Sequence, residues 1–132
     1  MMAKIHMSIL TPERAIFEGD SDAVYAMMHD GDRGFLPGHA PMVGILGIGM
    51  LRVFRDGIMT AFEVEGGFLE ISKNRLIILA EDAMKKEELS EKLVKAEIDS
   101  VESELAVASP ESRKKLELKK KKLASRLQVA VR

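Results

Sequence analysis

The sequence predicts an α+β protein in which a β-sandwich of about ten short strands precedes an antiparallel two-helix hairpin. Two observations carry this prediction. Up to residue 84, short apolar segments with a period of two alternate with turn residues, which is typical of a sandwich or barrel. From residue 85, apolar residues recur every three or four positions, which indicates helices. We therefore expect two domains, at residues 1–84 and 85–132.

Three strands are predicted in the first 28 residues, at 5–9, 15–17 and 23–28. In the first, Ile5, Met7 and Ile9 alternate with polar residues, as in a half-buried strand. We expect Glu18-Gly19-Asp20 to end the second strand, since such residues favour turns. A polar loop at residues 30–34 is expected to follow the third.

A corner is predicted at residues 35–43, which read Phe-Leu-Pro-Gly-His-Ala-Pro-Met-Val. Pro37 and Pro41 lack backbone donors, so they cannot both lie in the middle of a paired sheet. Such a segment is either a docking surface or a tight bend. Its chemistry alone leaves His39 open between a structural and an interface role.

The next strands are predicted at 50–54, 58–64, 68–71 and 75–79. Asp56-Gly57 favours the positive φ angles of a tight hairpin turn between the first two. Alternation in the second strand places Glu63 and Glu65 on the face opposite Val64. Two consecutive glycines are expected to bend the chain before the third strand.

The first helix is predicted from a stripe of apolar residues spaced by four, three, four and three: Val94, Ile98, Val101, Leu105 and Ala108. Glu87, Glu88 and Glu91 are expected in its first turns, where the helix dipole favours anions. Ser109-Pro110 is expected to stop this helix and start the next, because serine caps helices and proline fits the first position.

The second helix is predicted over residues 110–130, with an apolar stripe of Leu116, Leu123, Leu127 and Ala130. The short link between the helices favours an antiparallel hairpin. Both stripes are narrow, so the hairpin buries little area by itself. We therefore expect it to be marginally stable and able to leave its resting place.

Composition argues against catalysis and metal binding. The chain has no cysteine, and its three histidines lie at no spacing that makes ligands converge. Asp30 and Asp32 resemble the start of a calcium loop, but the required downstream glycine and glutamate are missing. An enzyme using His39 with either aspartate remains a rival hypothesis, which needs the side chains to converge. The longest apolar run has ten residues, so we expect no membrane insertion.

The end of the chain is basic. Residues 113–132 carry nine bases and one acid, although the net charge of the whole chain is −1. This flank is solvated, binds phosphates or meets an acidic protein surface. Nucleic acid is less attractive because the remainder is acidic and lacks interleaved aromatic residues. A small sandwich module whose basic helix binds nucleic acid or anionic membrane is the main alternative function.

Four motifs carry a resemblance along nearly the whole chain: residues 34–41, Gly-Phe-Leu-Pro-Gly-His-Ala-Pro; residues 49–51, Gly-Met-Leu; residues 66–71, Gly-Gly-Phe-Leu-Glu-Ile; and residues 79–83, Leu-Ala-Glu-Asp-Ala. In order and spacing they resemble the epsilon subunit of the F-type ATP synthase. This resemblance implies a sandwich with a two-helix tail and a noncatalytic rotor subunit. It also implies a peripheral place at the cytoplasmic face of the bacterial plasma membrane, and a monomer when isolated.

The resemblance also implies partners. In the family the sandwich joins the gamma subunit to the ring of c subunits, so that proton flow turns the central stalk. The implied gamma-subunit interface is Gly38, His39, Ala40 and Pro41. The implied loop facing the c-ring is Asp30, Gly31, Asp32 and Arg33.

The tail of this family extends along gamma and inhibits ATP hydrolysis, with basic residues of the second helix meeting the catalytic alpha and beta subunits. The matching residues are Arg113, Lys114, Lys115, Lys119, Lys120, Lys121, Lys122 and Arg126. Some members bind ATP through an Ile/Leu-Asp-x-x-Arg-Ala motif, where this chain reads Leu-Ser-Glu-Lys-Leu-Val at residues 89–94. The aspartate and the arginine are missing, so we expect no ATP cofactor.

Overall fold

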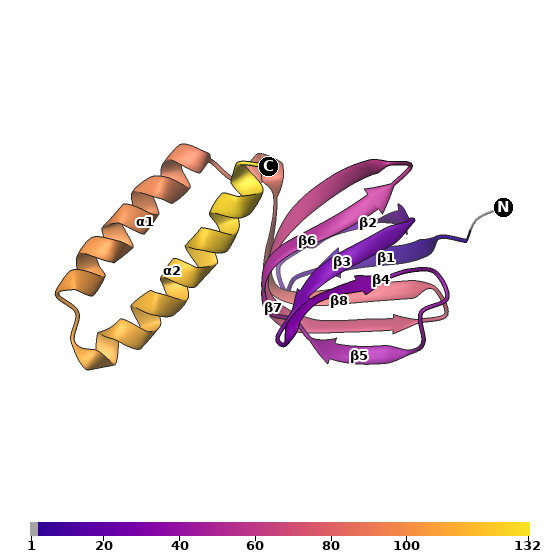
Figure 1. Cartoon of the computed structure of the whole chain (residues 1–132), viewed down its shortest axis with the longest axis horizontal. Coiled ribbons are helices and arrows are strands. Elements are labelled where there is room, and N and C mark those ends of the chain that lie inside the picture. The colour runs from indigo at the N-terminus through magenta and orange to yellow at the C-terminus, as the bar shows by residue number, and fades with distance from the viewer. Residues whose placement is uncertain (1–2) are drawn as a thin grey trace.

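The computed structural model describes residues 3–132 and sets a β-sandwich beside a helical hairpin (Figure 1). Within these residues the eight strands are β1 (Ile5–Leu10), β2 (Ala15–Ser21), β3 (Ala23–Met28), β4 (Gly31–Phe35), β5 (Met42–Ile45), β6 (Ile48–Arg55), β7 (Ile58–Ser72) and β8 (Arg75–Lys85). The helices are the 3₁₀ turn η1 (Lys86–Glu88), α1 (Glu91–Ala106) and α2 (Pro110–Ala130). The predicted α+β class, a sandwich followed by two helices, is confirmed.

The strands form one sheet that folds over itself into two layers. Its order is β2-β1-β8-β7-β6-β3-β4, and β5 pairs with β7 outside this path. The first half of β7 pairs with β6, and its second half pairs with β5. The fold-over lies at Gly66 and Gly67, whose φ angles are 73° and 109°. Only glycine adopts such angles without strain, so these two residues let one strand serve both layers.

The strands depart from the expected ones in three places. Residues 58–64 and 68–71 belong to one strand, since the two glycines bend β7 without breaking its pairing with β8. The expected turn at residues 18–20 continues β2, which pairs with β1 as far as Ser21. The expected polar loop at residues 30–34 is mostly β4, which pairs with β3 from Gly31 to Phe35.

The core lies between the two layers. Ile5, Met7 and Ile9 are fully buried, which confirms the alternation predicted for β1. Strand β8 adds Leu76 and Ile78, likewise fully buried. Burying a side chain of this size contributes roughly 1.5–3 kcal/mol, so the sandwich has a substantial core of its own.

The hairpin follows the predicted pattern closely. α2 begins at Pro110 with Ser109 as its N-cap, and the side chain of Ser109 accepts a hydrogen bond from the backbone of Ser112. The stripe residues that pack together are Val94, Ile98, Val101, Leu105, Leu116, Leu123 and Leu127. Ala108 lies beyond the end of α1. Glu87 and Glu88 lie in η1 and not in α1, because Ser90 caps α1 immediately before Glu91.

The hairpin meets the sandwich through one helix. α2 lies between α1 and the sandwich and packs against β6 and β7 (Figure 1). Neither helix described in residues 3–132 has the length and apolar character needed to span a membrane.

Candidate functional site

The corner between β4 and β5 is held by a hydrogen bond to the β7–β8 turn and by one within the corner itself. The backbone N–H of Gly38 donates to Oδ1 of Asn74 at 2.7 Å, and Gly38 has a φ of 88°. The backbone N–H of His39 donates to the carbonyl of Leu36 at 3.1 Å, closing a turn. These bonds fix the corner in advance of any partner, which lowers the entropy lost on docking.

The ring of His39 is part of this corner. Its centroid lies 5.1 Å from that of the buried Phe35, and its Nδ1 lies 2.7 Å from the carbonyl oxygen of Ala40. A carbonyl can only accept, so Nδ1 carries the proton and Nε2 is the nitrogen left for other contacts. The ring therefore has a structural role on one side, and it is half-buried.

The implied ring-facing segment is a hairpin tip and a strand. Asp30 lies in the turn between β3 and β4, whereas Gly31, Asp32 and Arg33 belong to β4. The carboxylate of Asp32 forms an ion pair with Arg52 on β6.

Asp30 and His39 lie beyond opposite ends of β4. The five residues of β4 span roughly 14 Å, so these side chains do not converge. Asp32 is engaged by Arg52. Among residues 3–132, no three carboxylate or imidazole groups are arranged to hold a metal ion. The version of the enzyme hypothesis that pairs Asp30 with His39 therefore loses the convergence that it requires.

An exposed apolar patch continues from the corner onto the outer face of β5, β7 and β8. We call it the outer patch and define it as Val43, Ile45, Phe68 and Leu79, each more than half exposed. Ile45 pairs with Phe68, and Phe68 pairs with Leu79, so their side chains are direct cross-strand neighbours. A contiguous exposed patch of this kind marks an interaction surface more often than a scattered apolar residue does.

A shallow hollow of about 360 Å³ borders the outer patch, between Phe68 and Leu79 on one side and Leu10 and Pro12 on the other. Sequence reasoning missed this surface. The run of four consecutive apolar residues at 76–79 could have indicated it. A strand with one solvated face normally alternates apolar and polar residues, so an unbroken run predicts an apolar outer face.

Two buried glutamates lie where α2 covers the sheet. The side chains of Glu63 and Glu65 on β7 are 0% and 2% exposed. The hydroxyl of Ser125 donates to Oε2 of Glu63 at 2.7 Å. The guanidinium of Arg126 donates to both oxygens of Glu65, at 2.7 and 3.1 Å. Alternation placed both glutamates on the face opposite Val64, and α2 is what buries them there.

The pKa values of the two glutamates move in opposite directions. Burial, together with the neighbouring Glu65, raises the pKa of Glu63 to about 9. Burial also acts to raise the pKa of Glu65, but hydrogen bonds from Glu63 and Arg126 outweigh it and hold that pKa below its ordinary value. At neutral pH Glu63 is therefore protonated and Glu65 is charged.

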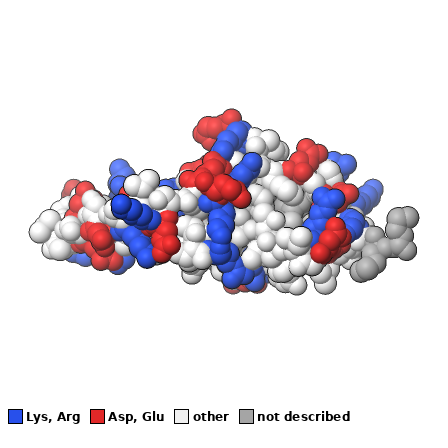
Figure 2. Space-filling model, turned by 90° about the horizontal axis from the view of Figure 1, so that it is seen from above, with Lys and Arg blue, Asp and Glu red and all other residues white. Residues whose placement is uncertain are grey.

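The basic flank of α2 is largely exposed. Lys119, Lys120 and Lys121 are exposed, Lys122 is half-buried, and Nζ of Lys120 lies 3.5 Å from a carboxylate oxygen of Glu102 on α1. Figure 2 shows positive and negative side chains interspersed on one face of the molecule. Arg126 is separate from this flank, because its guanidinium is engaged by Glu65 on the sheet.

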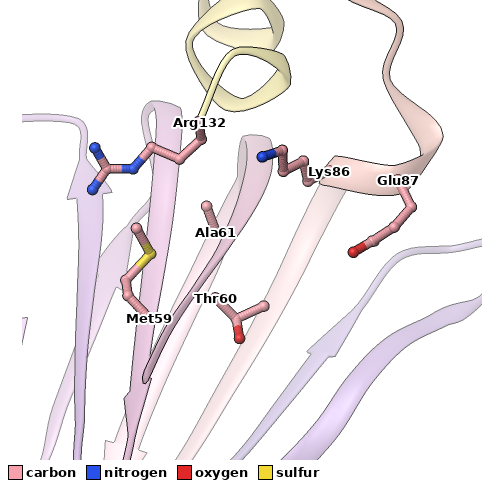
Figure 3. A pocket seen from close by; sticks show the side chains of 6 residues that line it. All are labelled: Met59, Thr60, Ala61, Lys86, Glu87 and Arg132. Carbon is pink, nitrogen blue, oxygen red and sulfur yellow. The ribbon is translucent and has the colours of Figure 1, made fainter. Parts of the chain in front are cut away.

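A hollow of about 440 Å³ opens at the junction of η1, the start of β7 and the end of the chain. Figure 3 shows Lys86 and Arg132 above Ala61, with Glu87 beside them. Charges of both signs line this hollow.

Comparison with known proteins identifies the family. The model of the ATP synthase delta/epsilon chain β-sandwich domain matches residues 4–86, which include every strand described above. The chain belongs to this family. Together with the curated relatives described next, this match confirms the resemblance to the epsilon subunit.

Several curated relatives are named ATP synthase epsilon chain. The one from Leptospira borgpetersenii is 34% identical over 98% of this chain and 97% of its own length. The one from Desulforudis audaxviator is 38% identical over 79% of this chain and 76% of its own. The match to the Roseiflexus relative is 42% identical, and there the chain spans 63% of the relative's length.

Two solved structures share the fold. A chain of the Euglena gracilis mitochondrial ATP synthase superposes with a TM-score of 0.86 at 19% identity, over 100% of this chain and 84% of that one. A chain from the central stalk and c-ring of the Tetrahymena thermophila mitochondrial ATP synthase gives 0.63 at 12% identity, over 97% of both. Both likenesses include the helices as well as the sandwich.

Proposed function

We propose that this chain is a noncatalytic subunit of the central stalk of a rotary ATP synthase, joining the gamma subunit to the c-ring for proton-driven ATP synthesis. The Leptospira relative, aligned over almost the whole of both chains, is the observation that carries the proposal. The chain would work as a peripheral component at the cytoplasmic face of the membrane. It would be a monomer when isolated.

The gamma subunit is proposed to dock on the corner of Gly38, His39, Ala40 and Pro41 together with the outer patch. Pro41 leads directly into β5, so the corner and the patch form one continuous surface. Burial of its apolar part would contribute favourable binding free energy, and the fixed corner would orient gamma on the surface. The segment of Asp30, Gly31, Asp32 and Arg33, which leads from β3 into β4, is proposed to face the polar loops of the c-ring. There its charges would fix the register of the contact.

Co-purification with gamma tests this surface. Replacing Phe68 and Leu79 by Gln should abolish capture of the chain by tagged gamma, because apolar contact area is lost at the centre of the surface. Ile58→Gln is the matched control, since Ile58 is also an exposed apolar residue but lies at the β6–β7 turn. If the double variant is still captured, or if the control variant is captured as poorly as the double variant, gamma does not dock on this face.

The hairpin is proposed to leave the sandwich and inhibit ATP hydrolysis by meeting the catalytic alpha and beta subunits. Two separate apolar clusters support this proposal, one inside the sandwich and one between α1 and α2. Departure of the hairpin therefore disrupts neither cluster. The exposed bases of α2 would then meet an acidic segment of a catalytic subunit.

Truncation after Met84 should raise the ATPase rate of the assembled complex. A full-length variant with Lys119–Lys122 replaced by Gln should relieve inhibition in the same direction while keeping the hairpin folded. An ATPase rate unchanged by both alterations would exclude an inhibitory hairpin.

ATP is proposed not to regulate the hairpin. Ser90, at the position of the motif's aspartate, is used as the N-cap of α1, where its side chain accepts from the backbone of Leu93. Leu93 itself is exposed and replaces the motif's arginine. Calorimetry of the full chain with millimolar ATP should give no binding isotherm, and a clear isotherm would overturn this proposal.

A further inference from the structure

We propose that Glu63 and Glu65 form a proton-binding seat for α2, so that departure of the hairpin from the sandwich releases a proton. The inference rests on the proposed mobility of the hairpin and adds a condition that controls it. Near neutral pH, alkalinisation would favour release.

The seat holds two carboxyl groups but only one dedicated cation. Arg126 donates both of its short hydrogen bonds to Glu65 and lies 3.9 Å from Oε1 of Glu63. From β8, a carboxylate oxygen of Asp82 lies 3.8 Å from the same guanidinium and competes for its charge. Lys122 is the other α2 cation that acts on the seat. Charge balance inside the seat therefore favours one proton shared by the two glutamates.

Glu63 is the group that holds this proton. Its Oε2 accepts from the hydroxyl of Ser125, which is uncharged. Its Oε1 is buried and accepts a hydrogen bond from no donor among the described residues. A buried carboxylate in this position, beside a second carboxylate, is strongly unfavourable, whereas the neutral acid can use the proton on Oε1 as a donor.

The direction of the pH effect follows from the two pKa values. With α2 docked, the pKa of Glu63 is about 9. Exposure to water would return this pKa to roughly 4.3 once α2 has left. A raised pKa in the docked state means that docking is strongest below the undocked value and weakens as pH rises through this window. Because the pKa of Glu65 is lowered, its charge stabilises docking at any pH above its ordinary pKa. This stabilisation is lost only on strong acidification. Between about pH 5 and 9, each hairpin that leaves the sandwich releases one proton. The ratio of released to docked chains therefore rises tenfold per pH unit.

Carbon NMR titration of the full chain tests proton retention directly. The side-chain carboxyl resonance of Glu63, assigned with Glu63→Gln, should titrate well above pH 7, whereas that of Glu65 should titrate below its ordinary value. Titration of Glu63 near its ordinary value would overturn the proposal, whatever the hairpin does.

Fluorescence energy transfer tests the coupling. The chain has no native cysteine, so labels can be placed at Val107→Cys and Ile58→Cys, both exposed and on different sides of the joint. A Val129→Ala background brings the equilibrium into range, because Val129 is fully buried one turn after Ser125 and carries no charge. The ratio of released to docked chains should rise about tenfold per unit between pH 6 and 8.

Glu63→Gln should make this ratio independent of pH, because a neutral amide imitates the protonated acid. Glu70→Gln is the matched control, since Glu70 lies on the same strand and is exposed, and its slope should equal that of the parent. A ratio that does not change with pH in the parent, or an equal slope in Glu63→Gln, would overturn the proton-binding seat. ATPase inhibition measured separately in the assembled complex distinguishes failure of the seat from failure of the inhibitory role.

Discussion

Gly67 is the residue on which the fold-over of the sheet depends most directly. A Cβ at this position would lie 2.0 Å from the carbonyl oxygen of Leu79, and the φ of 109° is strained for any other residue. Gly67→Ala should therefore lower the free energy of unfolding by about 3 kcal/mol in urea denaturation. Gly38→Ala shares the positive φ but has nothing within 4 Å, and should cost only about 1 kcal/mol. Equal costs would show that the backbone collision does not matter.

His39 combines a structural and an exposed side. Its tilted ring contact with Phe35 and its hydrogen bond to the carbonyl of Ala40 are local, so they stabilise the corner more than the core. His39→Ala should weaken binding to gamma at least tenfold while lowering the melting temperature of the sandwich by only a few degrees. Calorimetry and binding measured on the same preparation decide between these roles. A large drop in melting temperature with unchanged binding would make the histidine purely structural.

At the residue scale, prediction succeeded where the cause is local. Asp56 and Gly57 were expected to take positive φ angles, and they do, at 51° and 78°. The burial of Glu63 and Glu65 was not foreseeable in this way, because it depends on α2, which is more than forty residues away in sequence. A pair of acids beside apolar neighbours gives no sign of which helix will cover it.

At the scale of elements, the caps decide where the hairpin begins and ends. Ser109 caps α2, and its Oγ lies 3.3 Å from the backbone nitrogen of Ser112. Ser109→Ala should lower the stability of the hairpin by about 1 kcal/mol, measured by amide exchange along α2. Ser103→Ala is the control, because its hydroxyl only bonds back to Asp99 within α1 and should be neutral. An equal loss in both variants would remove the special role of the cap.

Both helices were well predicted because caps and apolar stripes are local signals, and the expected bounds of α2 match the structure. Strand β4 was missed because the residues Gly-Asp-Arg-Gly carry no apolar alternation. This segment pairs with β3 through its backbone, which any sequence other than proline can do. The predicted β8 ended too early for a similar reason, since its residues 82–85 gain their partners from β7.

At the scale of the whole molecule, the two apolar clusters predict two levels of protection. α1 packs on α2 and lies away from the sandwich (Figure 1), and the sandwich core contains no helical residue. Hydrogen exchange should therefore be faster for amides of α1 and α2 than for those of β1 and β8, by a factor of 100 or more. Equal protection throughout would mean that the chain opens only as one unit.

The general arrangement of a sandwich followed by a hairpin could be predicted because the hydrophobic period changes near residue 85. The outer patch and the seat of α2 could not, because both depend on which faces the closed sheet presents. The corner was recognised as special from its prolines. Its separation from Asp30 became visible only when β4 was placed between them.

The pairing of β1 with β8 has a consequence for the order of folding. β1 lies between β2 and β8, and its residues His6 to Leu10 run parallel to Arg75 to Leu79. β1 is therefore synthesised well before β8, the last strand of the sandwich, and must wait for it before one of its edges is covered. Closing so long a loop is entropically costly and slows folding. During synthesis, the apolar face of the β1–β2 hairpin is the nascent segment most in need of protection from aggregation.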